Sequence, residues 1–371
     1  MPTSREQGQA EHDHPTILHR GGVGDDAGGS GIGGGSRQVW VPGPVIVGAG
    51  PSGLATAACL KVRGVLSLVL EKDSCVAASW RHRTYERLRL HLPRCFCELP
   101  LAPFPPGTPP YPTRDQFIAY LDDYARAFGI EPRLGARVRR AAYDAAIGFW
   151  RVTVDEDAGD DGGATAAATE FLSRWLVVAT GENAEPAWPE GVEGMDGYRG
   201  VAMHTSSYKK GDEFRGKNVL VVGGGNSGME VSLDLCNNGA KASMVVRDKV
   251  VPAIQRFTEN GVEFVDGHRE DFDAVIFATG YKSNVPSWLK EEDLFSHFDG
   301  FPRKPFHTAG GARTASMQPA SPRMASWAPP TMLLGLPATS RTNGRRPLRA
   351  PLLPTEAVTT VNDESVRTPH H

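Results

Sequence analysis

Two clusters of closely spaced glycines are the residues of this 371-residue chain whose spacing points most clearly to chemistry. The first cluster reads Gly48-Ala49-Gly50-Pro51-Ser52-Gly53. In a G-x-G-x-x-G pattern the first glycine permits a tight turn, the second lets the backbone approach a pyrophosphate, and the third lets a helix pack closely on a strand. The N–H groups and positive dipole end of that helix would face the phosphates. The cluster predicts a dinucleotide site, the alternative being a glycine-rich turn that binds nothing.

An acidic residue follows the first cluster at the distance that such a site requires. Glu71 ends the next apolar segment, 23 positions after Gly48, where its carboxylate could accept hydrogen bonds from a ribose diol. A strand, a glycine turn, a helix and an acid in this order make the pattern specific. A carboxylate at this position favours an unphosphorylated ribose, as in FAD or NAD.

The second cluster, Gly223-Gly224-Gly225-Asn226-Ser227-Gly228, repeats the pattern. The apolar segment after it ends on Arg247 and not on an acid. A guanidinium there would pair with a 2′-phosphate, so this site should prefer NADP to NAD. An ordinary solvated arginine at a strand end is the other interpretation. Sites for FAD and NADPH in one chain indicate the transfer of hydride onto a flavin, which carries the difficult chemistry.

The elements that must position these clusters can be located from hydrophobic patterning. Short apolar runs, typical of buried parallel strands, occupy 45–47, 67–70, 175–179, 219–222, 243–246 and 273–278, and 149–154 alternates like a half-buried strand. Helical spacing marks 54–64, 114–129 and 229–235, and residues 155–169 look like an exposed hairpin or loop. Strands and helices alternate around each cluster, which predicts an α/β protein with two Rossmann-like dinucleotide-binding domains.

Composition narrows the functional classes. The net charge of −3 provides no field that would attract nucleic acid, and no apolar stretch is long enough to span a membrane. The five cysteines include no CxxC pair and no zinc-site spacing, so we expect no metal and only buried or incidental thiols in a reducing compartment. A cytoplasmic enzyme acting on a small-molecule substrate fits these features, and they leave the oligomeric state open.

Both ends of the chain differ in composition from the middle. Residues 1–40 form a polar, glycine-rich leader that is expected to be disordered. Residues 307–371 hold nine prolines, seven arginines and no lysine, and disorder is expected there too, a regulatory or interaction tail being the alternative. Between the ends we place an FAD-binding domain at 41–185 and about 265–306, interrupted by a shortened NADPH-binding domain at 186–264.

A third motif lies between the two clusters. Tyr198-x-Gly200-x-x-x-His204-x-x-x-Tyr208 resembles the FxGxxxHxxx(Y/F) motif of class B flavin monooxygenases, with tyrosine in place of the usual first phenylalanine. The segments VIVGAGPSGLATAACL, TYERLRLHLPRCFCELP, VLVVGGGNSGMEVSLDL and VIFATGYKSNVPSWL are similar to the plant YUCCA group of these enzymes. The resemblance covers roughly residues 42–306.

The resemblance implies a reaction as well as cofactors. In the YUCCA group NADPH reduces FAD, the reduced flavin reacts with O₂, and indole-3-pyruvate is oxidatively decarboxylated to the auxin indole-3-acetic acid. An aromatic 2-keto acid is therefore the implied substrate, and no catalytic side-chain nucleophile is expected. Family positions near the flavin match Trp80, Thr180 and Gly181, and Thr279-Gly280 closes a later strand in the same way. Plain core packing is the other interpretation of Trp80.

The chain departs from the family pattern in two places. The segment VVPAIQRFTENGVEFVDG follows Arg247 almost at once, where the family has further residues of the NADPH domain. Too few residues separate Arg247 from Phe272 for another helix and strand of a parallel sheet. Past Phe306 the resemblance stops, which suggests an altered reading frame or a splicing variant. The alternative functions are therefore an inactive variant that at most binds FAD, an N- or S-oxygenating monooxygenase and, disfavoured by the missing dithiol, a disulfide reductase.

Overall fold

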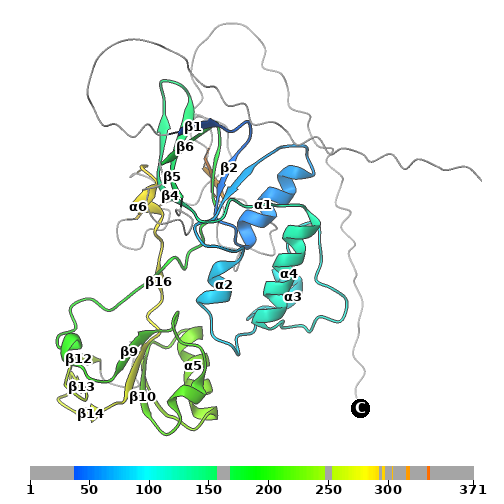
Figure 1. Ribbon diagram of the computed structural model, residues 1–371. Coiled ribbons are helices and arrows are strands. Elements are labelled where there is room, and N and C mark those ends of the chain that lie inside the picture. The colour runs from blue at the N-terminus through cyan, green and yellow to red at the C-terminus, as the bar shows by residue number, and fades with distance from the viewer. Residues whose placement is uncertain are drawn as a thin grey trace, which may run out of the picture. The chain divides into compact units, whose positions relative to one another are not determined.

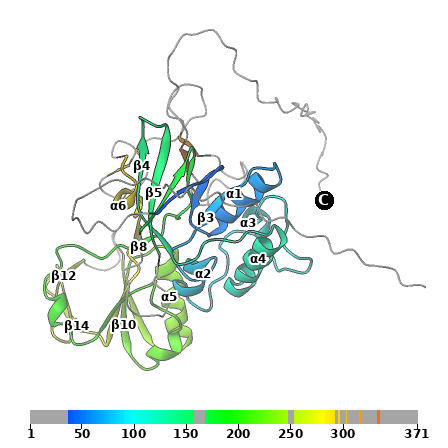
Figure 2. The same cartoon turned by 45° about the horizontal axis from the view of Figure 1, so that its top comes forward.

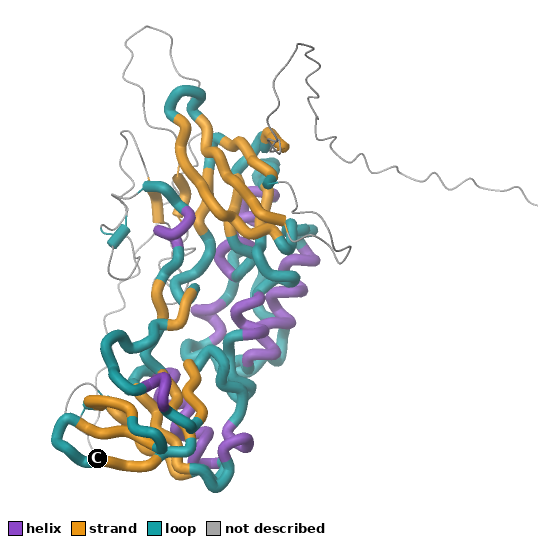
Figure 3. Tube along the Cα trace, turned by 60° about the vertical axis from the view of Figure 1, so that its left-hand side comes forward, coloured by secondary structure: helices purple, strands orange, loops and turns teal. Residues whose placement is uncertain are grey.

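The computed structural model of the protein describes most of the chain between residues 37 and 291. The described residues are 37–156, 168–246, 253–291, 295, 296 and 303, together with the backbone of short strands at 315–317 and 332–334. The chain divides into two compact units, 1–337 and 338–371, and every element described here belongs to the first. Figure 1 labels the elements, and Figure 3 distinguishes helices from strands.

The first glycine cluster joins β2, an inner strand of a five-stranded sheet, to a helix. The sheet has the order β17-β18-β7-β2-β3, with β2 at Val45–Val47, β3 at Leu68–Leu70 and β7 at Leu176–Val178. These three strands are parallel. β2 and β7 are buried along their whole length, as their uninterrupted apolar runs predict.

Two longer helices accompany this sheet and lie beside each other (Figure 1 and Figure 2). α1 (Pro51–Lys61) has Gly50 as its N-cap and a proline in its first turn, where an N–H would have no helical partner in any case. α4 (Arg114–Ala127) begins with a capping box, in which the Thr113 hydroxyl accepts the Gln116 N–H and the Gln116 amide oxygen accepts the Thr113 N–H. The predicted aromatic face of α4 is buried in a cluster that includes residues of α1.

A four-stranded sheet of order β1-β6-β5-β4 shares a core with the first sheet. Its strands are β1 (Arg37–Trp40), β4 (Ala136–Asp144), β5 (Phe149–Glu156) and β6 (Thr169–Ser173). β1 pairs with β6, so the expectation of disorder up to residue 40 is wrong for the last four leader residues. The first 36 residues lie outside the described part of the chain.

The second glycine cluster joins a strand and a helix in the same way. The sheet has the order β11-β10-β15-β9 and is parallel throughout, with β9 at Val201–His204, β10 at Asn218–Val222, β11 at Lys241–Val245 and β15 at Ala274–Phe277. α5 (Asn226–Asn237) packs on β10 and β11. Because β15 pairs with β10 and β9, the chain leaves this sheet after residue 277 and not at about 265, where the sequence placed the boundary.

The described residues 254–271, between β11 and β15, form an antiparallel meander. Its strands are β12 (Ile254–Phe257), β13 (Gly261–Phe264) and β14 (Arg269–Asp271). Phe257, Val262 and Phe264 pack with Leu220 and Phe277 of the parallel sheet. The remaining elements are short: α2 (Ala78–His82), α3 (Arg94–Cys97), α6 (Val285–Trp288), the paired strands β8 (Glu185–Pro186) and β16 (Tyr281–Lys282), and single 3₁₀ turns at Met195–Gly197 and Gly211–Phe214.

Two strands fall in the C-terminal segment for which the sequence shows no regular period. β17 (Ala315–Met317) and β18 (Met332–Leu334) form an antiparallel pair, and β18 adds to β7 of the first sheet. The expectation of disorder over 307–371 is therefore wrong for these six residues. The other positions of that segment, and Arg247, lie outside the described residues.

Candidate functional site

Backbone contacts in the first glycine turn leave no room for side chains at its first and third glycines. Gly48 has a φ of +107°, and a Cβ there would lie 2.5 Å from the Ala179 carbonyl oxygen. A Cβ on Gly53 would lie 1.9 Å from the carbonyl oxygen of Gly48. α1 therefore lies directly against the turn, which is the close helix–strand packing that the pattern predicts.

The second turn has the same construction. Gly223 has a φ of +120°, and its Cβ would lie 2.4 Å from the Ala278 carbonyl oxygen; a Cβ on Gly228 would lie 1.9 Å from the Gly223 oxygen. The alanine that follows β7 in the first sheet and β15 in the second lies against the third glycine, with Cβ distances of 3.6 and 3.3 Å from the added atom. A small residue is needed there because the helix comes so close.

The middle glycines differ from the others because they border empty space. A Cβ on Gly50 or on Gly225 would meet nothing within 4 Å. Each of these residues is the N-cap of its helix, α1 or α5, and neither cap makes a side-chain hydrogen bond to the helix N–H groups. Both helix starts therefore combine an open backbone with N–H groups and a positive dipole end, which is the arrangement that binds phosphate.

A cavity of about 700 Å³ reaches from the first glycine turn to the start of α5, the helix that follows the second glycine turn. Of the predicted site residues it is lined by Gly48, Gly50, Pro51, Ser52, Glu71, Trp80, Thr180, Gly181, Asn226 and Ser227. Its wall is completed by parts of α2, β4 and the segments 179–185 and 281–288. One cavity thus brings together residues from both glycine clusters, which lie far apart in the sequence.

Glu71 is buried at the wall of this cavity and is held by backbone donors. Its Oε2 accepts the Ala49 N–H at 2.7 Å, and its Oε1 accepts the Asp73 N–H at 3.1 Å. The Ala49 carbonyl in turn accepts the N–H of Ala77, the residue before α2, at 3.0 Å. A carboxylate has about four acceptor positions, so two remain for the hydroxyls of a ribose.

Two buried polar atoms on the cavity wall have no partner among the described residues. They are Oγ1 of Thr180 and Oδ1 of Asn284. Leaving such an atom unpaired costs on the order of 1–3 kcal/mol, so most buried polar groups are satisfied. A polar ligand in the cavity would supply both partners. Together with the open backbone at Gly50, these atoms fit a group as large and polar as FAD.

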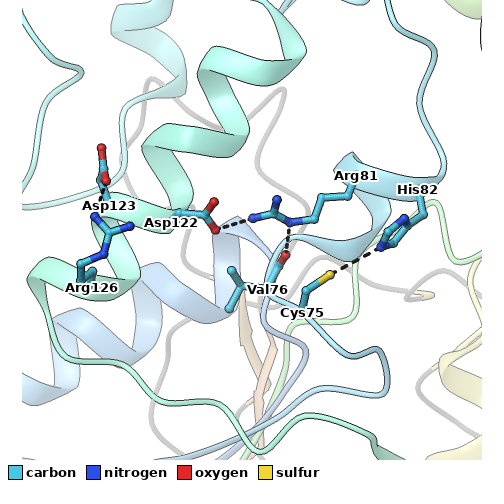
Figure 4. A network of polar contacts seen from close by, with 7 residues as sticks. All are labelled: Cys75, Val76, Arg81, His82, Asp122, Asp123 and Arg126. Carbon is cyan, nitrogen blue, oxygen red and sulfur yellow. Dashed lines mark hydrogen bonds and ion pairs between the residues drawn. The ribbon is translucent and has the colours of Figure 1, made fainter.

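Trp80 lines the same cavity from the short helix α2, which a ring contact and an ion pair connect to α4. The Trp80 ring meets the Phe117 ring edge-on, with centroids 4.6 Å apart. The next residue, Arg81, donates from Nε to the Val76 carbonyl at 3.0 Å and forms an ion pair with Asp122 of α4 (Figure 4). These contacts fix the orientation of α2, which is too short to be stable alone.

The third motif is structural in this chain. A Cβ on Gly200 would lie 2.2 Å from the Tyr198 hydroxyl oxygen, so the ring of Tyr198 requires a glycine there. The Tyr198 hydroxyl donates to the Phe272 carbonyl at 2.7 Å, and the Tyr208 hydroxyl donates to Asp234 of α5 at 2.6 Å. Burial raises the pKa of Tyr198 to about 12, so its hydroxyl keeps its proton. The motif connects β9 to its neighbours.

His204 serves the same purpose. Its Nδ1 accepts the Ser206 N–H at 3.1 Å, which leaves Nε2–H to donate to the Gly280 carbonyl at 3.0 Å. Burial lowers the pKa of His204 although the bond to Gly280 acts in the opposite direction, so the ring is neutral near pH 7. His204 is absent from the cavity wall. It ties the end of β9 to the turn after β15.

Several predicted site residues are not part of the cavity wall. Ala49, Gly53, Gly223, Gly224, Gly225, Gly228, Thr279 and Gly280 do not line it. Thr279 donates its hydroxyl to the Ala187 carbonyl, and Gly280 accepts from His204. Arg247 lies outside the described residues.

Other cavity residues were missed by sequence reasoning. They are polar or aromatic: Arg83, Tyr85, His91, Tyr281, Asn284 and Trp288. All but Arg83 lie within the segments that resemble the family, and Arg83 directly precedes one of them. No spacing of residue types singles any of them out.

Two negative findings apply to the described residues alone. No helix among them has both the length and the apolar character needed to cross a bilayer. Within the same residues, no three potential metal ligands of the His, Cys, Asp or Glu type come together. All five cysteines are free, and none of them lines the cavity.

Comparisons with known proteins agree on the class of fold and chemistry. The pyridine nucleotide-disulphide oxidoreductase family matches residues 45–260. The chain is 47% identical to the indole-3-pyruvate monooxygenase YUCCA4 of Oryza sativa subsp. japonica over 355 residues, covering 72% of this chain and 80% of the relative. It is 45% identical to the indole-3-pyruvate monooxygenase YUCCA6 of Arabidopsis thaliana over 351 residues, covering 72% and 82%.

Solved structures show the same architecture. A flavin-containing monooxygenase from Stenotrophomonas maltophilia superimposes with a TM-score of 0.59 at 25% identity, over 75% of this chain and 87% of that one. OTEMO, in complex with FAD and NADP, gives a TM-score of 0.55 at 15% identity, over 68% and 73%, and so shares the fold. The predicted α/β class with two Rossmann-like domains is confirmed.

The comparison with the rice relative also shows that this chain is shorter. The alignment spans 355 residues but uses only 72% of the 371 residues here, so roughly 90 positions belong to the relative alone. Such a difference agrees with the loss of residues that the sequence suggests after Arg247. In the described structure, the next elements along the chain after that position are the strands of the meander β12–β14.

Proposed function

We propose, from the premise that this chain belongs to the family of YUCCA-type indole-3-pyruvate monooxygenases, that it is an FAD- and NADPH-dependent monooxygenase converting indole-3-pyruvate to indole-3-acetic acid. The observation that carries the proposal is the single cavity that both helix starts of the two glycine turns reach. The names of the relatives supply the substrate and the product. When bound, the flavin accepts hydride from the nicotinamide and activates O₂.

The chain's own residues would bind and orient FAD. The backbone at Gly50 and the N–H groups of α1 would hold the pyrophosphate, and the Glu71 carboxylate would accept the ribose hydroxyls. Thr180 and Asn284 present unpaired polar atoms that a flavin ring could satisfy. Trp80 closes one wall with an apolar ring that excludes water.

NADPH would use the second turn. Its pyrophosphate would lie at Gly225 and the N-terminus of α5, and Asn226 and Ser227 already face the shared cavity. Arg247 is proposed to pair with the 2′-phosphate, which would favour NADPH over NADH. The family that matches residues 45–260 also includes disulfide reductases by its description, but such an enzyme needs a redox dithiol, and no cysteine lines the cavity.

The proposal is tested by product analysis with purified protein, FAD, NADPH, O₂ and indole-3-pyruvate. We expect one equivalent of indole-3-acetic acid and of CO₂ for each NADPH oxidised in the coupled reaction. Oxidation of NADPH with release of H₂O₂ alone would mean that O₂ chemistry occurs without this substrate. Oxygenation of an added thioether or amine, with the keto acid untouched, would favour the N- or S-oxygenating alternative.

A further inference from the structure

The basic side chains of the cavity fall into two groups. Those beside Glu71 come from the end of β3 and from β4, whose first residue donates its N–H to the Glu71 carbonyl at 2.8 Å. They lie at the end of the cavity where a ribose would bind. A second group comes from the segment that follows α2. The first group is Lys72, Arg137 and Arg139, and the second is Arg83 and His91. The two groups are neighbours, because the positive charge of Arg83 adds to burial in lowering the pKa of Lys72.

Arg83 is the C-cap of α2 and connects it to the segment before β8. Its Nη1 donates to the carbonyl of Ala184 at 2.5 Å, immediately before β8. β8 pairs with β16, which carries Tyr281. Burial raises the pKa of Tyr281, while the hydrogen bond with Thr205 and the positive charge of Arg83 oppose that rise. The side chains of Arg83 and Tyr281 are therefore near neighbours. Asn226 of the second turn lines the same cavity.

The charge of Arg83 has no acidic partner among the described residues. Arg139, on the same cavity wall, pairs with Asp155 at 2.8 Å, whereas among the described residues Arg83 hydrogen-bonds to the neutral Ala184 carbonyl. A half-buried cation without a counter-ion is unfavourable unless a ligand neutralises it. A guanidinium has five N–H donors in a fork that matches a carboxylate, so one bond to a carbonyl leaves donors available.

Aromatic side chains line the same cavity as Arg83. Trp80 and Tyr85 come from the α2 segment, and Tyr281 and Trp288 come from the segment around α6. A cation beside aromatic walls suits a ligand with a flat ring and an acid group. We propose that Arg83 binds the carboxylate of the aromatic 2-keto acid and so determines the preference for an acid over a neutral ketone. The inference rests on the proposed function, since it concerns the substrate of the same site.

The test measures binding without turnover, using the full chain loaded with FAD and no NADPH. Calorimetry gives the dissociation constants of indole-3-pyruvate and of indole-3-acetone, the matched ketone in which a methyl group replaces the carboxylate. In Arg83→Gln we expect the dissociation constant of the acid to rise about ten- to hundredfold, the range for a lost charge-assisted pair. That of the neutral ketone should change less than about twofold. Arg83→Lys should restore part of the acid affinity, because it keeps the charge but not the fork.

Arg89→Gln is the matched control. Arg89 comes from the same segment and also donates Nη1 to a backbone carbonyl, that of Tyr111 at 3.3 Å, but it is exposed and does not line the cavity. Its replacement should leave both dissociation constants unchanged. Melting curves and the FAD content of each variant show whether it is folded, and if Arg83→Gln fails to retain FAD, the milder Arg83→Lys still reports the ratio of acid to ketone affinity.

The outcomes separate this inference from the proposed function. Equal weakening of acid and ketone, or a loss confined to FAD or NADPH affinity, would overturn the role of Arg83 and point to a phosphate as its ligand. A wild-type protein that makes indole-3-acetic acid while Arg83→Gln keeps its preference for the acid would overturn the inference alone. Selective loss of acid binding in a protein that never turns over would support Arg83 and contradict the proposed reaction.

Discussion

Two glycines three positions apart should respond to alanine in opposite ways. A Cβ on Gly53 would lie 1.9 Å from the backbone oxygen of Gly48, and backbone cannot move aside as a flexible side chain can. Overpacking of this kind costs about 1–3 kcal/mol or more. Gly50 has φ −81° and ψ −174°, which alanine adopts readily, and a Cβ there would meet nothing within 4 Å. Gly50→Ala should therefore change the free energy of unfolding by less than about 0.5 kcal/mol.

The same Gly50→Ala change should damage FAD binding, because the methyl group fills the space through which the pyrophosphate reaches the backbone. Loss of one charge-assisted hydrogen bond, at about 1.5–3 kcal/mol, raises the FAD dissociation constant by roughly ten- to 150-fold. Urea unfolding of the apoprotein and FAD titration by fluorescence quenching measure the two effects separately. Wild-type FAD affinity in Gly50→Ala, or wild-type stability in Gly53→Ala, would refute this account of the turn.

Three further changes test other parts of the structure. Asp122→Asn removes the ion pair between α4 and α2 and should raise the FAD dissociation constant about two- to fivefold, since a partly exposed pair contributes about 0.5–1 kcal/mol. Asp123, beside it in Figure 4, pairs with Arg126 on its own helix, so Asp123→Asn should leave the FAD dissociation constant unchanged. Equal effects of the two changes would contradict a role of α2 in FAD binding. The pKa of His204 is lowered by burial, so below about pH 6.5 the unfolded chain binds a proton that the folded chain does not; the stabilisation is complete above that pH and is lost as the pH falls. In His204→Gln, the dependence of the free energy of unfolding on pH, measured by urea unfolding between pH 5 and 7.5, should therefore be weaker by up to about 1.4 kcal/mol per pH unit. An unchanged pH dependence would count against a neutral, buried His204. Arg247→Glu should weaken NADPH binding by about 2–4 kcal/mol and NADH binding less, and equal losses would remove Arg247 from the 2′-phosphate.

The sequence located the repeated strand–turn–helix units because their signals are local. Apolar runs and glycine spacing predicted the strand at 45–47, and helical spacing predicted the helices that the structure places at Pro51–Lys61 and Arg114–Ala127. β4 was missed because four of its nine residues are charged and only two are buried, so its sequence shows no clear alternation; the strand is held by pairing with β5. The boundary at 265 was misplaced because membership of β15 in the second sheet depends on long-range pairing that no local pattern encodes.

The residues of the candidate site likewise divide into those with a local sequence signal and those that only the folded chain brings together. The residues that the backbone geometry requires, such as Gly48 and Gly53, can be predicted from residue type and spacing. Arg83 and Asn284 cannot, because they reach the cavity from segments more than a hundred residues apart and are ordinary surface types by sequence. The unpaired Oδ1 of Asn284, and the position of Arg83 on the cavity wall without an acidic partner among the described residues, are visible only in the folded chain. The sequence marks His204 as a motif histidine, and the structure shows that it is a buried residue whose hydrogen bonds connect the end of β9 to the turn after β15.

The most direct measurement of the central claim is the visible absorbance of the purified, FAD-loaded protein before and after anaerobic addition of NADPH. We expect a flavin spectrum that bleaches on NADPH addition, because Asn226 and Ser227 of the second turn border the cavity that the first turn opens into. A flavin spectrum that persists would contradict a working second site in this shortened chain. Failure to acquire any flavin spectrum after FAD is supplied would contradict the first site as well.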